Sequence, residues 1–231
     1  MRERSATPMK PAVRRTTLAV DVVVLSPRDD SLMLLLVRAP SGARERWSLP
    51  WDAPQADESL EDAAARIAHT VLGITPTFFE QVGAVSDGRR HPGDADVSVG
   101  IVALSPMPAG NPSADAEWFA LSALPPLAPR HRAIVERAAA VVRQRVDQSP
   151  LAFRLLPLTF TLSDLQGVYE LLLGRRLHKA SFRRALQASY LVEPTDEWRS
   201  EGRGRPAQLF RFAPKKRRGV RRGVRFDLFT E

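Results

Sequence analysis

The chain has 231 residues and carries 34 Lys and Arg against 26 Asp and Glu, which gives a formal net charge of +8. It contains no cysteine, which excludes disulfides and thiolate metal sites. With 44% hydrophobic residues it can bury one large core or two modest ones. The longest apolar runs have only the length of a strand, so we expect no signal peptide, no membrane span and a cytoplasmic location.

The excess of positive charge lies in the last third of the chain. Residues 1–150 contain 17 basic and 18 acidic residues, whereas residues 151–231 contain 17 and 8. Such a basic region favours a polyanion as its partner, because cations on the protein release counterions from phosphates. The alternative is a solvated basic tail that only aids solubility.

The first two thirds of the chain predict a domain of strands and helices. Residues 1–15 are rich in Arg, Pro and Thr, and we expect them to form a disordered arm. β-branched and leucine-rich runs predict strands at 17–25, 32–38, 78–85, 97–104 and 117–119. A turn is expected at 26–30, a helix at 59–72 that stops at Gly73, and an amphipathic helix at 129–146.

Residues 47–74, WSLPWDAPQADESLEDAAARIAHTVLGI, are the most informative segment. They resemble the Nudix box, whose pattern is G-x5-E-x7-R-E-U-x-E-E-x-G-U, where U is aliphatic. Glu58, Arg66 and Gly73 stand at matching positions. The remaining glutamates are replaced by Ile67, Thr70 and Val71, and Trp51 and Asp52 stand where the family has glycines.

The missing glutamates matter because residues three and four apart share one face of a helix and can direct several carboxylates at one Mg²⁺ ion. That ion performs the Lewis-acid work of the hydrolysis. We therefore expect no metal and no enzyme activity, with Glu58, Arg66 and Gly73 kept as a structural remnant in which the first two form an ion pair. The alternative is a hydrolase whose metal ligands have moved to Glu61, Asp62 or Glu80.

The region after residue 148 predicts a DNA-binding module. Thr161 to Asp164 form a variant of the capping box at the start of a helix that Gly174 ends, and a second helix is expected at 180–189. A hairpin follows, with a strand from Tyr190, a polar loop at 194–206 and a strand at 207–212. Two short helices and a basic hairpin are the outline of a winged helix.

Four spaced segments strengthen this interpretation: SPLAFRLLP from residue 149, FTLSDLQGVYELLLGR from 160, SFRRAL from 181 and GRGRPAQLFRF from 202. Together with the Nudix-like domain they resemble the Nudix-related transcriptional regulator (NrtR-like) family. The resemblance implies an α/β fold, a Nudix-like α/β/α sandwich with a mixed sheet at 16–148 that senses an effector and forms a dimer. A winged helix at 149–213 and a basic tail at 214–231 would follow.

Members of this family are dimeric bacterial repressors of NAD metabolism or sugar-utilisation genes, and many sense ADP-ribose. The resemblance implies a homodimer on a pseudo-palindromic operator in double-stranded DNA, with a small nucleotide as effector and no cofactor. DNA would be bound by Lys179, Ser181, Arg183, Arg184, Arg203 and Arg205. The effector would be bound by Arg38, Trp47 and Arg90.

Two alternatives remain open at this point. Trp51 and His91, which stands where the family has Asp, depart from the family pattern and favour a DNA-binding protein that needs no ligand. The run 215–225 is either a loose tail or a source of nonspecific attraction to phosphates.

Overall fold

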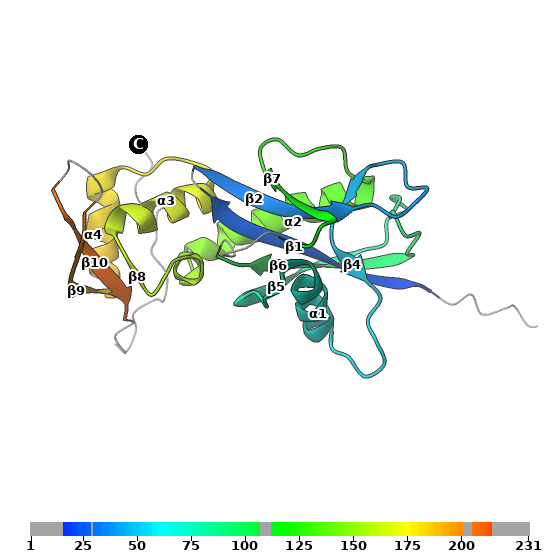
Figure 1. The fold of residues 1–231 in the computed structure, drawn as a ribbon, viewed down its shortest axis with the longest axis horizontal. Helices are drawn as coiled ribbons and strands as arrows, with labels where there is room; N and C mark the ends of the chain where they lie inside the picture. The colour runs from blue at the N-terminus through cyan, green and yellow to red at the C-terminus, as the bar shows by residue number, and fades with distance from the viewer. Residues whose placement is uncertain (1–15, 29, 107–111, 201–204, 214–231) are drawn as a thin grey trace, which may run out of the picture.

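The computed structural model describes residues 16–28, 30–106, 112–200 and 205–213. The molecule is elongated, with the sheet of the N-terminal domain at one end and the small C-terminal domain at the other (Figure 1). The predicted arm 1–15, the whole predicted tail 214–231 and Arg203 lie outside the described residues.

A mixed sheet forms the centre of the N-terminal domain, as predicted. Its strands are β1 (Leu18–Arg28), β2 (Ser31–Arg38), β3 (Trp47–Ser48), β4 (Trp51–Asp52), β5 (Phe78–Val85), β6 (Val97–Leu104) and β7 (Ala116–Ala120). The order is β3-β2-β1-β6-β5, with β4 paired to β1 and β7 to β2. Only the β1 and β6 pair is parallel among these strand pairs, and the others are antiparallel.

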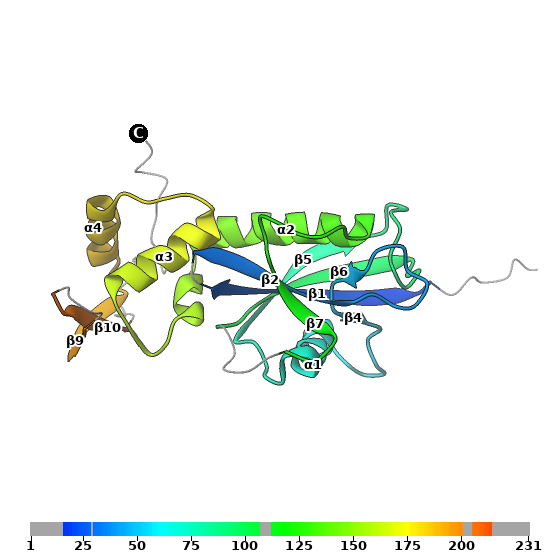
Figure 2. The same ribbon diagram turned by 45° about the horizontal axis from the view of Figure 1, so that its top comes forward.

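One helix covers each face of the sheet, which makes the sandwich (Figure 2). Alternate residues of β1 point to opposite faces, because the side-chain period of a strand is two. Val20, Val22 and Val24 pack with the residues of α1 (Leu60–Leu72), whereas Val23 and Leu25 pack with those of α2 (Pro129–Val146).

Both helices begin and end close to the predicted residues. Ser59 caps α1 by accepting a hydrogen bond from the Asp62 N–H, and Gly73 ends the helix with a left-handed φ of 70°. Proline stands at the first position of α2, where its missing N–H costs nothing. The helix itself covers the predicted range 129–146.

The C-terminal domain is a winged helix. It contains a 3-10 turn (Leu151–Leu155), β8 (Thr159–Phe160), α3 (Leu162–Leu173), α4 (Lys179–Ser189), β9 (Val192–Arg199) and β10 (Ala207–Phe212). The predicted capping box is present, because Thr161 Oγ1 accepts from the Asp164 N–H and Asp164 Oδ2 accepts from the Thr161 N–H. The three strands form a small antiparallel sheet in the order β8-β10-β9.

A single buried cluster connects the two domains. It runs from β1 and β2 through α2 into α3 and α4, where Tyr169, Phe182 and Leu186 are almost fully buried. Helices α2 and α3 pack against each other, so the winged helix rests on the C-terminal half of α2. A movement of α2 would therefore also move the C-terminal winged helix.

The sequence-based boundaries were wrong in several places. β1 continues to Arg28 and β2 starts at Ser31, so the turn is shorter than the predicted 26–30. The first strand of the wing extends to Arg199, so residues 194–199 of the predicted loop 194–206 belong to a strand. The short strands β3, β4 and β8 were missed altogether. No helix in the described residues is both long and apolar enough to cross a membrane.

Candidate functional site

The face of α1 that carries glutamates in the Nudix box is partly built into the core. Ile67 is 5% exposed and belongs to the cluster between α1 and the sheet. Val71 packs against the same cluster, and its carbonyl accepts a hydrogen bond from the Ser113 N–H. Thr70 is exposed and donates its hydroxyl to the Arg66 carbonyl, 2.9 Å away. None of these three side chains supplies a carboxylate for Mg²⁺.

Glu58 and Arg66, which match the Nudix box, form an ion pair between the loop before α1 and the helix itself. Arg66 donates to Glu58 through Nε at 2.8 Å and Nη2 at 3.0 Å, and Glu58 Oε2 also accepts from the Gln55 N–H. Hydrogen bonding to Arg66 lowers the pKa of Glu58 to about 2 and raises that of Arg66. Asp52, at a glycine position of the box, accepts a hydrogen bond from Nη1 of Arg66 at 2.7 Å. The structure thus shows the ion pair that the sequence predicted.

The acids of the alternative hydrolase do not gather at one point. Glu61 and Asp62 lie in the first turn of α1, and Asp62 is bonded to the capping Ser59 hydroxyl. Glu80 of β5 instead receives a hydrogen bond from Arg145 of α2 at 2.6 Å. Since α1 and α2 cover opposite faces of the sheet, these acids form no common metal site.

The three residues expected at the effector site are connected through the segment between β2 and β3. The guanidinium of Arg38 lies 4.4 Å from the ring centroid of Trp47, and Arg90 forms an ion pair with Glu45. Trp47 itself is 8% exposed and meets Phe119 edge to face at 4.9 Å. Trp47 is thus a core residue with arginine over one ring face, so a ligand would reach the arginines before the indole.

A pocket of about 320 Å³ opens beside Arg90, which falls in the size range of small-molecule sites. Arg89, Arg90 and Arg130 line it together with Asp94 and Asp96. Arg130 is 4% exposed and donates to the Ala95 carbonyl, so its charge is held in place. The pocket therefore presents three arginines to a ligand, one of them fixed by burial, together with two carboxylates.

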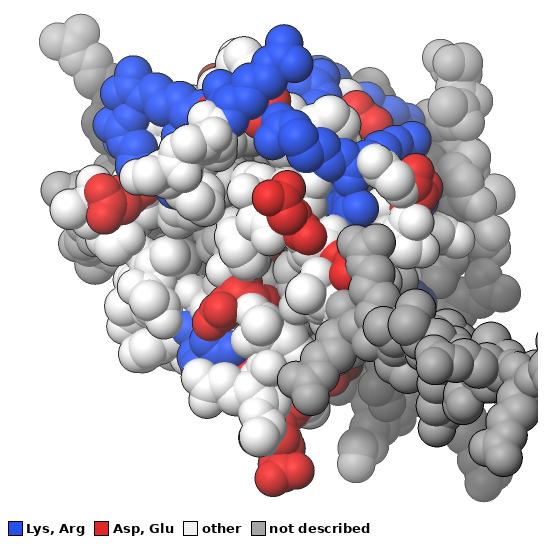
Figure 3. Space-filling view, turned by 90° about the vertical axis from the view of Figure 1, so that its right-hand side faces the viewer, with Lys and Arg blue, Asp and Glu red and all other residues white. Residues whose placement is uncertain are grey.

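The N-terminal domain also carries a basic edge (Figure 3). Figure 3 views the end of the molecule farthest from the winged helix, and Lys and Arg side chains gather along its upper edge. Three exposed arginines lie on this part of the chain: Arg38 ends β2, and Arg44 and Arg46 belong to the connection from β2 to β3. Arginines of this kind pair well with a diphosphate.

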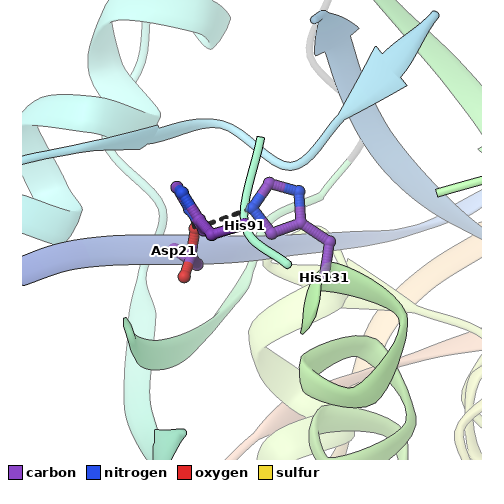
Figure 4. A group of neighbouring side chains, drawn as sticks. All are labelled: Asp21, His91 and His131. Carbon is purple, nitrogen blue, oxygen red and sulfur yellow. Dashed lines mark hydrogen bonds and ion pairs between the residues drawn. The ribbon is translucent and has the colours of Figure 1, made fainter. Parts of the chain in front are cut away.

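His91, the residue after Arg90, belongs to a buried cluster with Asp21 and His131 (Figure 4). Asp21 comes from β1, His91 from the loop between β5 and β6, and His131 from the first turn of α2; all three are at most 1% exposed. His91 Nε2 lies 3.0 Å and His131 Nε2 2.9 Å from the same oxygen, Asp21 Oδ1. Asp21 Oδ1 thus connects the loop of His91, the strand β1 and the helix α2.

The backbone fixes the proton positions in this cluster. His91 Nδ1 accepts from the Gly93 N–H and His131 Nδ1 accepts from the Leu49 N–H, each at 3.0 Å. Both neutral rings must therefore carry their proton on Nε2, where it is donated to Asp21. Burial raises the pKa of Asp21, but the two donors outweigh it and hold the pKa well below its ordinary value. Burial lowers the pKa of His131, which keeps it neutral.

This cluster is the one group in the described part of the chain with the spacing of metal ligands. Ligation through Nε2 would move the imidazole proton to Nδ1, where it would face a backbone N–H. The donor set therefore fits a hydrogen-bonded carboxylate better than a cation.

Trp51 and His91, the two departures from the family pattern, fit each other. Their rings meet edge to face at 4.7 Å. The indole also covers Gly93, where an added Cβ would come within 2.0 Å of the ring. The indole therefore packs on the loop of His91 and Gly93, and Trp51 is not among the residues that line the pocket beside Arg90.

Helix α4 presents a basic outer face. Lys179, Arg183 and Arg184 are exposed, whereas Phe182 is 1% exposed and belongs to the core. Ser181 is half-buried, with its Oγ 3.3 Å from His178 Nδ1. The apolar side of the helix is thus fixed and the basic side is free to meet a partner.

The wing is attached to α3 by an ion pair. Arg199 of β9 reaches both carboxylate oxygens of Asp164 at 2.8 Å. Arg205, just before β10, is exposed, and Trp198 is 56% exposed opposite Gln208. Arg203 falls outside the described residues.

Comparisons with known proteins agree with this architecture. The chain matches the NUDIX domain family over residues 15–138 and the NrtR DNA-binding winged helix domain family over residues 152–212. The ADPR responsive transcriptional repressor NtrR of Acinetobacter baylyi is 34% identical over 206 residues, which are 85% of this chain and 82% of that protein. The chain belongs to the NrtR family.

Two solved structures of the NrtR family are similar as well. Shewanella oneidensis NrtR complexed with a 27mer DNA superposes with a TM-score of 0.74 and 31% identity, over 85% of this chain and 94% of that one. The NUDIX domain of the same protein complexed with ADP ribose gives a TM-score of 0.50 and 26% identity, over 58% of this chain and 94% of that one.

Sequence reasoning missed the buried cluster in this member of the NrtR family. Asp21 was visible only as a charge inside an apolar strand, and its partners are 70 and 110 positions away. A buried acid in a strand signals that a partner exists, because an unpaired buried charge is costly. The sequence alone does not say which of the four histidines are the partners of Asp21.

Proposed function

We propose that this chain is a DNA-binding transcriptional repressor whose Nudix domain binds ADP-ribose or a related nucleotide, and that NAD biosynthesis or salvage genes are its targets. The exposed basic face of α4, set on a buried apolar side, is the observation that carries the proposal. The A. baylyi relative described as an ADPR responsive repressor and the NrtR structures with DNA and with ADP ribose support it.

In this proposal α4 enters the major groove. Lys179, Ser181, Arg183 and Arg184 contact base edges or phosphates there, and the wing, with Arg203 and Arg205, holds the DNA backbone or the minor groove. The chain acts as a homodimer, so two winged helices meet the two half-sites of a pseudo-palindromic operator.

The effector binds at the basic end of the Nudix domain. Arg38 and Arg90 pair with the diphosphate, and the pocket beside Arg90 accommodates the rest of the ligand. Trp47 supports Arg38 from below instead of stacking on the ligand. The ligand is bound and not hydrolysed, because Ile67, Thr70 and Val71 supply no metal ligand.

The contacts of α2 provide a route from this pocket to the DNA. The loop of the pocket is tied to the first turn of α2 by the Arg130 N–H bond to the Arg90 carbonyl and by the Asp21 cluster. The other end of α2 packs on α3. A ligand that favours one position of the loop would therefore favour one position of the winged helices, a population shift.

Fluorescence anisotropy tests the proposal. A labelled duplex from the region flanking the protein's own gene is titrated against a scrambled duplex at fixed salt, with and without ADP-ribose. Preferential binding that ADP-ribose releases is expected. Specific binding that is indifferent to ADP-ribose would overturn the sensor, and equal binding to both duplexes would overturn the regulator.

The hydrolase alternative is tested in parallel. Purified protein is incubated with ADP-ribose and Mg²⁺, and release of AMP is followed by chromatography. We expect no turnover above a protein-free control, and Mg²⁺-dependent AMP release would contradict the proposal that the ligand is only bound.

A further inference from the structure

A second and larger pocket lies between the two domains. It measures about 420 Å³ and is formed by residues at the start of β2, the segment after β7, the last turns of α2 and the outer face of α3. Because both domains contribute to its walls, whatever fills it touches the sensor and the DNA-binding module at once.

Gly167 keeps this pocket open. It lies in the middle of α3, where glycine costs about 1 kcal/mol relative to alanine. Its φ is not positive, and an added Cβ would meet nothing within 4 Å, so neither backbone conformation nor close packing requires glycine. The open space on its outer side is the pocket itself.

The walls combine an apolar part with uncompensated positive charge. Leu32, Leu121 and Leu171 line the pocket and are only half-buried. Arg143 of α2 lines it as well, and has no hydrogen bond or ion pair to any other residue that the structure describes. Half-buried leucines next to an unpaired arginine suit a ligand with an apolar body and an anionic group.

The acids of the pocket do not cancel this charge. Glu170 accepts from Arg176 at 2.9 Å through Oε2, and from Gln166 and the Leu177 N–H through Oε1, so both its oxygens are in use. Asp30 is the other acid among the lining residues, and no hydrogen bond or ion pair joins it to Arg143 in the described part of the chain. The negative end of the α3 dipole near Gly174 amounts to about half a charge, less than one guanidinium.

We propose that this pocket is a binding site for a small organic anion, in which a ring or short chain covers the leucines and a carboxylate or phosphate monoester pairs with Arg143. The site is separate from the effector pocket beside Arg90, and its existence does not depend on the proposed function. An occupant would hold α2 and α3 in one arrangement.

Ligand-observed NMR titrations of the full chain test the site. Phenyl phosphate and benzoate serve as probes, and benzyl alcohol is the uncharged control. We expect saturable binding of an anionic probe, at least tenfold weaker binding of benzyl alcohol, and a loss of about tenfold in Arg143→Met. Gly167→Leu should abolish binding, because the leucine fills the pocket, while the melting temperature stays equal or rises.

A matched control separates this site from general charge effects. Arg132→Met removes the same charge from the same helix outside the pocket, and it should leave the dissociation constant unchanged. Unchanged binding in Gly167→Leu and Arg143→Met overturns the proposal. So does an equal loss in Arg132→Met, or the absence of saturable binding by either anionic probe.

Discussion

His91 and His131 donate to one oxygen of Asp21, and their rings meet edge to face with centroids 4.8 Å apart. His91 belongs to the loop between β5 and β6, His131 belongs to α2, and the carboxylate belongs to the central strand β1. One buried charge thus fixes the loop against the helix that supports the winged helix. Removing any of the three groups would leave buried polar atoms without partners, which is costly.

Stability should fall in mild acid because of His131. Its pKa is lower in the folded protein than in the unfolded chain, so unfolding takes up a proton once the pH is below about 6.5. The free energy of unfolding should be insensitive to this group above that pH, and should decrease by up to about 1.4 kcal/mol per pH unit below it until the folded pKa is reached. Urea unfolding followed by circular dichroism between pH 8 and pH 5 measures this slope.

The variant His131→Gln should be less stable at pH 8 but should lose part of that slope, since glutamine does not titrate. His69→Gln, on the exposed side of α1, is the matched control for loss of a histidine. An identical slope in wild type and His131→Gln would show that other groups set the acid sensitivity.

A glutamate of the Nudix box restored to α1 should lower the unfolding free energy at position 67 and leave it nearly unchanged at position 70. Ile67→Glu places a carboxylate among residues that are almost fully buried, and we expect a loss of about 3 kcal/mol or more in unfolding free energy. Thr70→Glu lies on the exposed side and should change stability by less than about 0.5 kcal/mol. Urea denaturation of both variants decides this, and equal stabilities would place residue 67 outside the core.

Glu45 should compete with the effector for Arg90. The ion pair between them must open before the guanidinium can bind a diphosphate. Under the proposed function, Glu45→Gln should bind ADP-ribose severalfold more tightly, and Arg90→Met about tenfold more weakly. Isothermal titration calorimetry measures both, with Glu61→Gln as a control for loss of a remote acid. Weaker binding in Glu45→Gln would mean that the carboxylate contacts the ligand.

Periodicity and capping predicted the helices of this chain well, because their signals are local. Pro129 and the apolar stripe set the start and the face of α2, and Gly73 and Gly174 end α1 and α3 with left-handed backbones. β9 was cut short because Pro194 and its acidic neighbours disfavour strands in isolation. Pairing with β10, a non-local interaction, extends it to Arg199.

The ion pair of Glu58 and Arg66 was predictable because the residues belong to one motif. The Asp21 cluster and the pocket between the domains were not, since each brings together residues from distant segments whose contacts only the fold determines. Trp47 illustrates the same limit. Its type suited both a core and a stacking site, and only the position of Phe119 and Arg38 around the ring distinguishes the two.

Charge reversal on α4 tests the DNA interface. Arg183→Glu with Arg184→Glu removes two cations and adds two repulsive charges at the surface proposed to face the operator, so affinity should fall by at least a hundredfold in fluorescence anisotropy. Both side chains are exposed, so circular dichroism and size-exclusion chromatography should show an unchanged fold and assembly. Arg132→Glu on α2 provides the same type of change away from the wing, and should retain most of the affinity.

The single alanine variants then distinguish how each arginine acts. If an arginine contacts phosphate, its alanine variant should lose affinity for the operator and for the scrambled duplex alike. The slope of log affinity against log salt concentration should then fall by about one unit. If an arginine contacts guanine, its alanine variant should lose affinity for the operator alone, by roughly 1–3 kcal/mol of binding free energy. Full operator affinity in the double charge-reversal variant would contradict the assignment of α4 as recognition helix, and would turn attention to the wing and to Arg205.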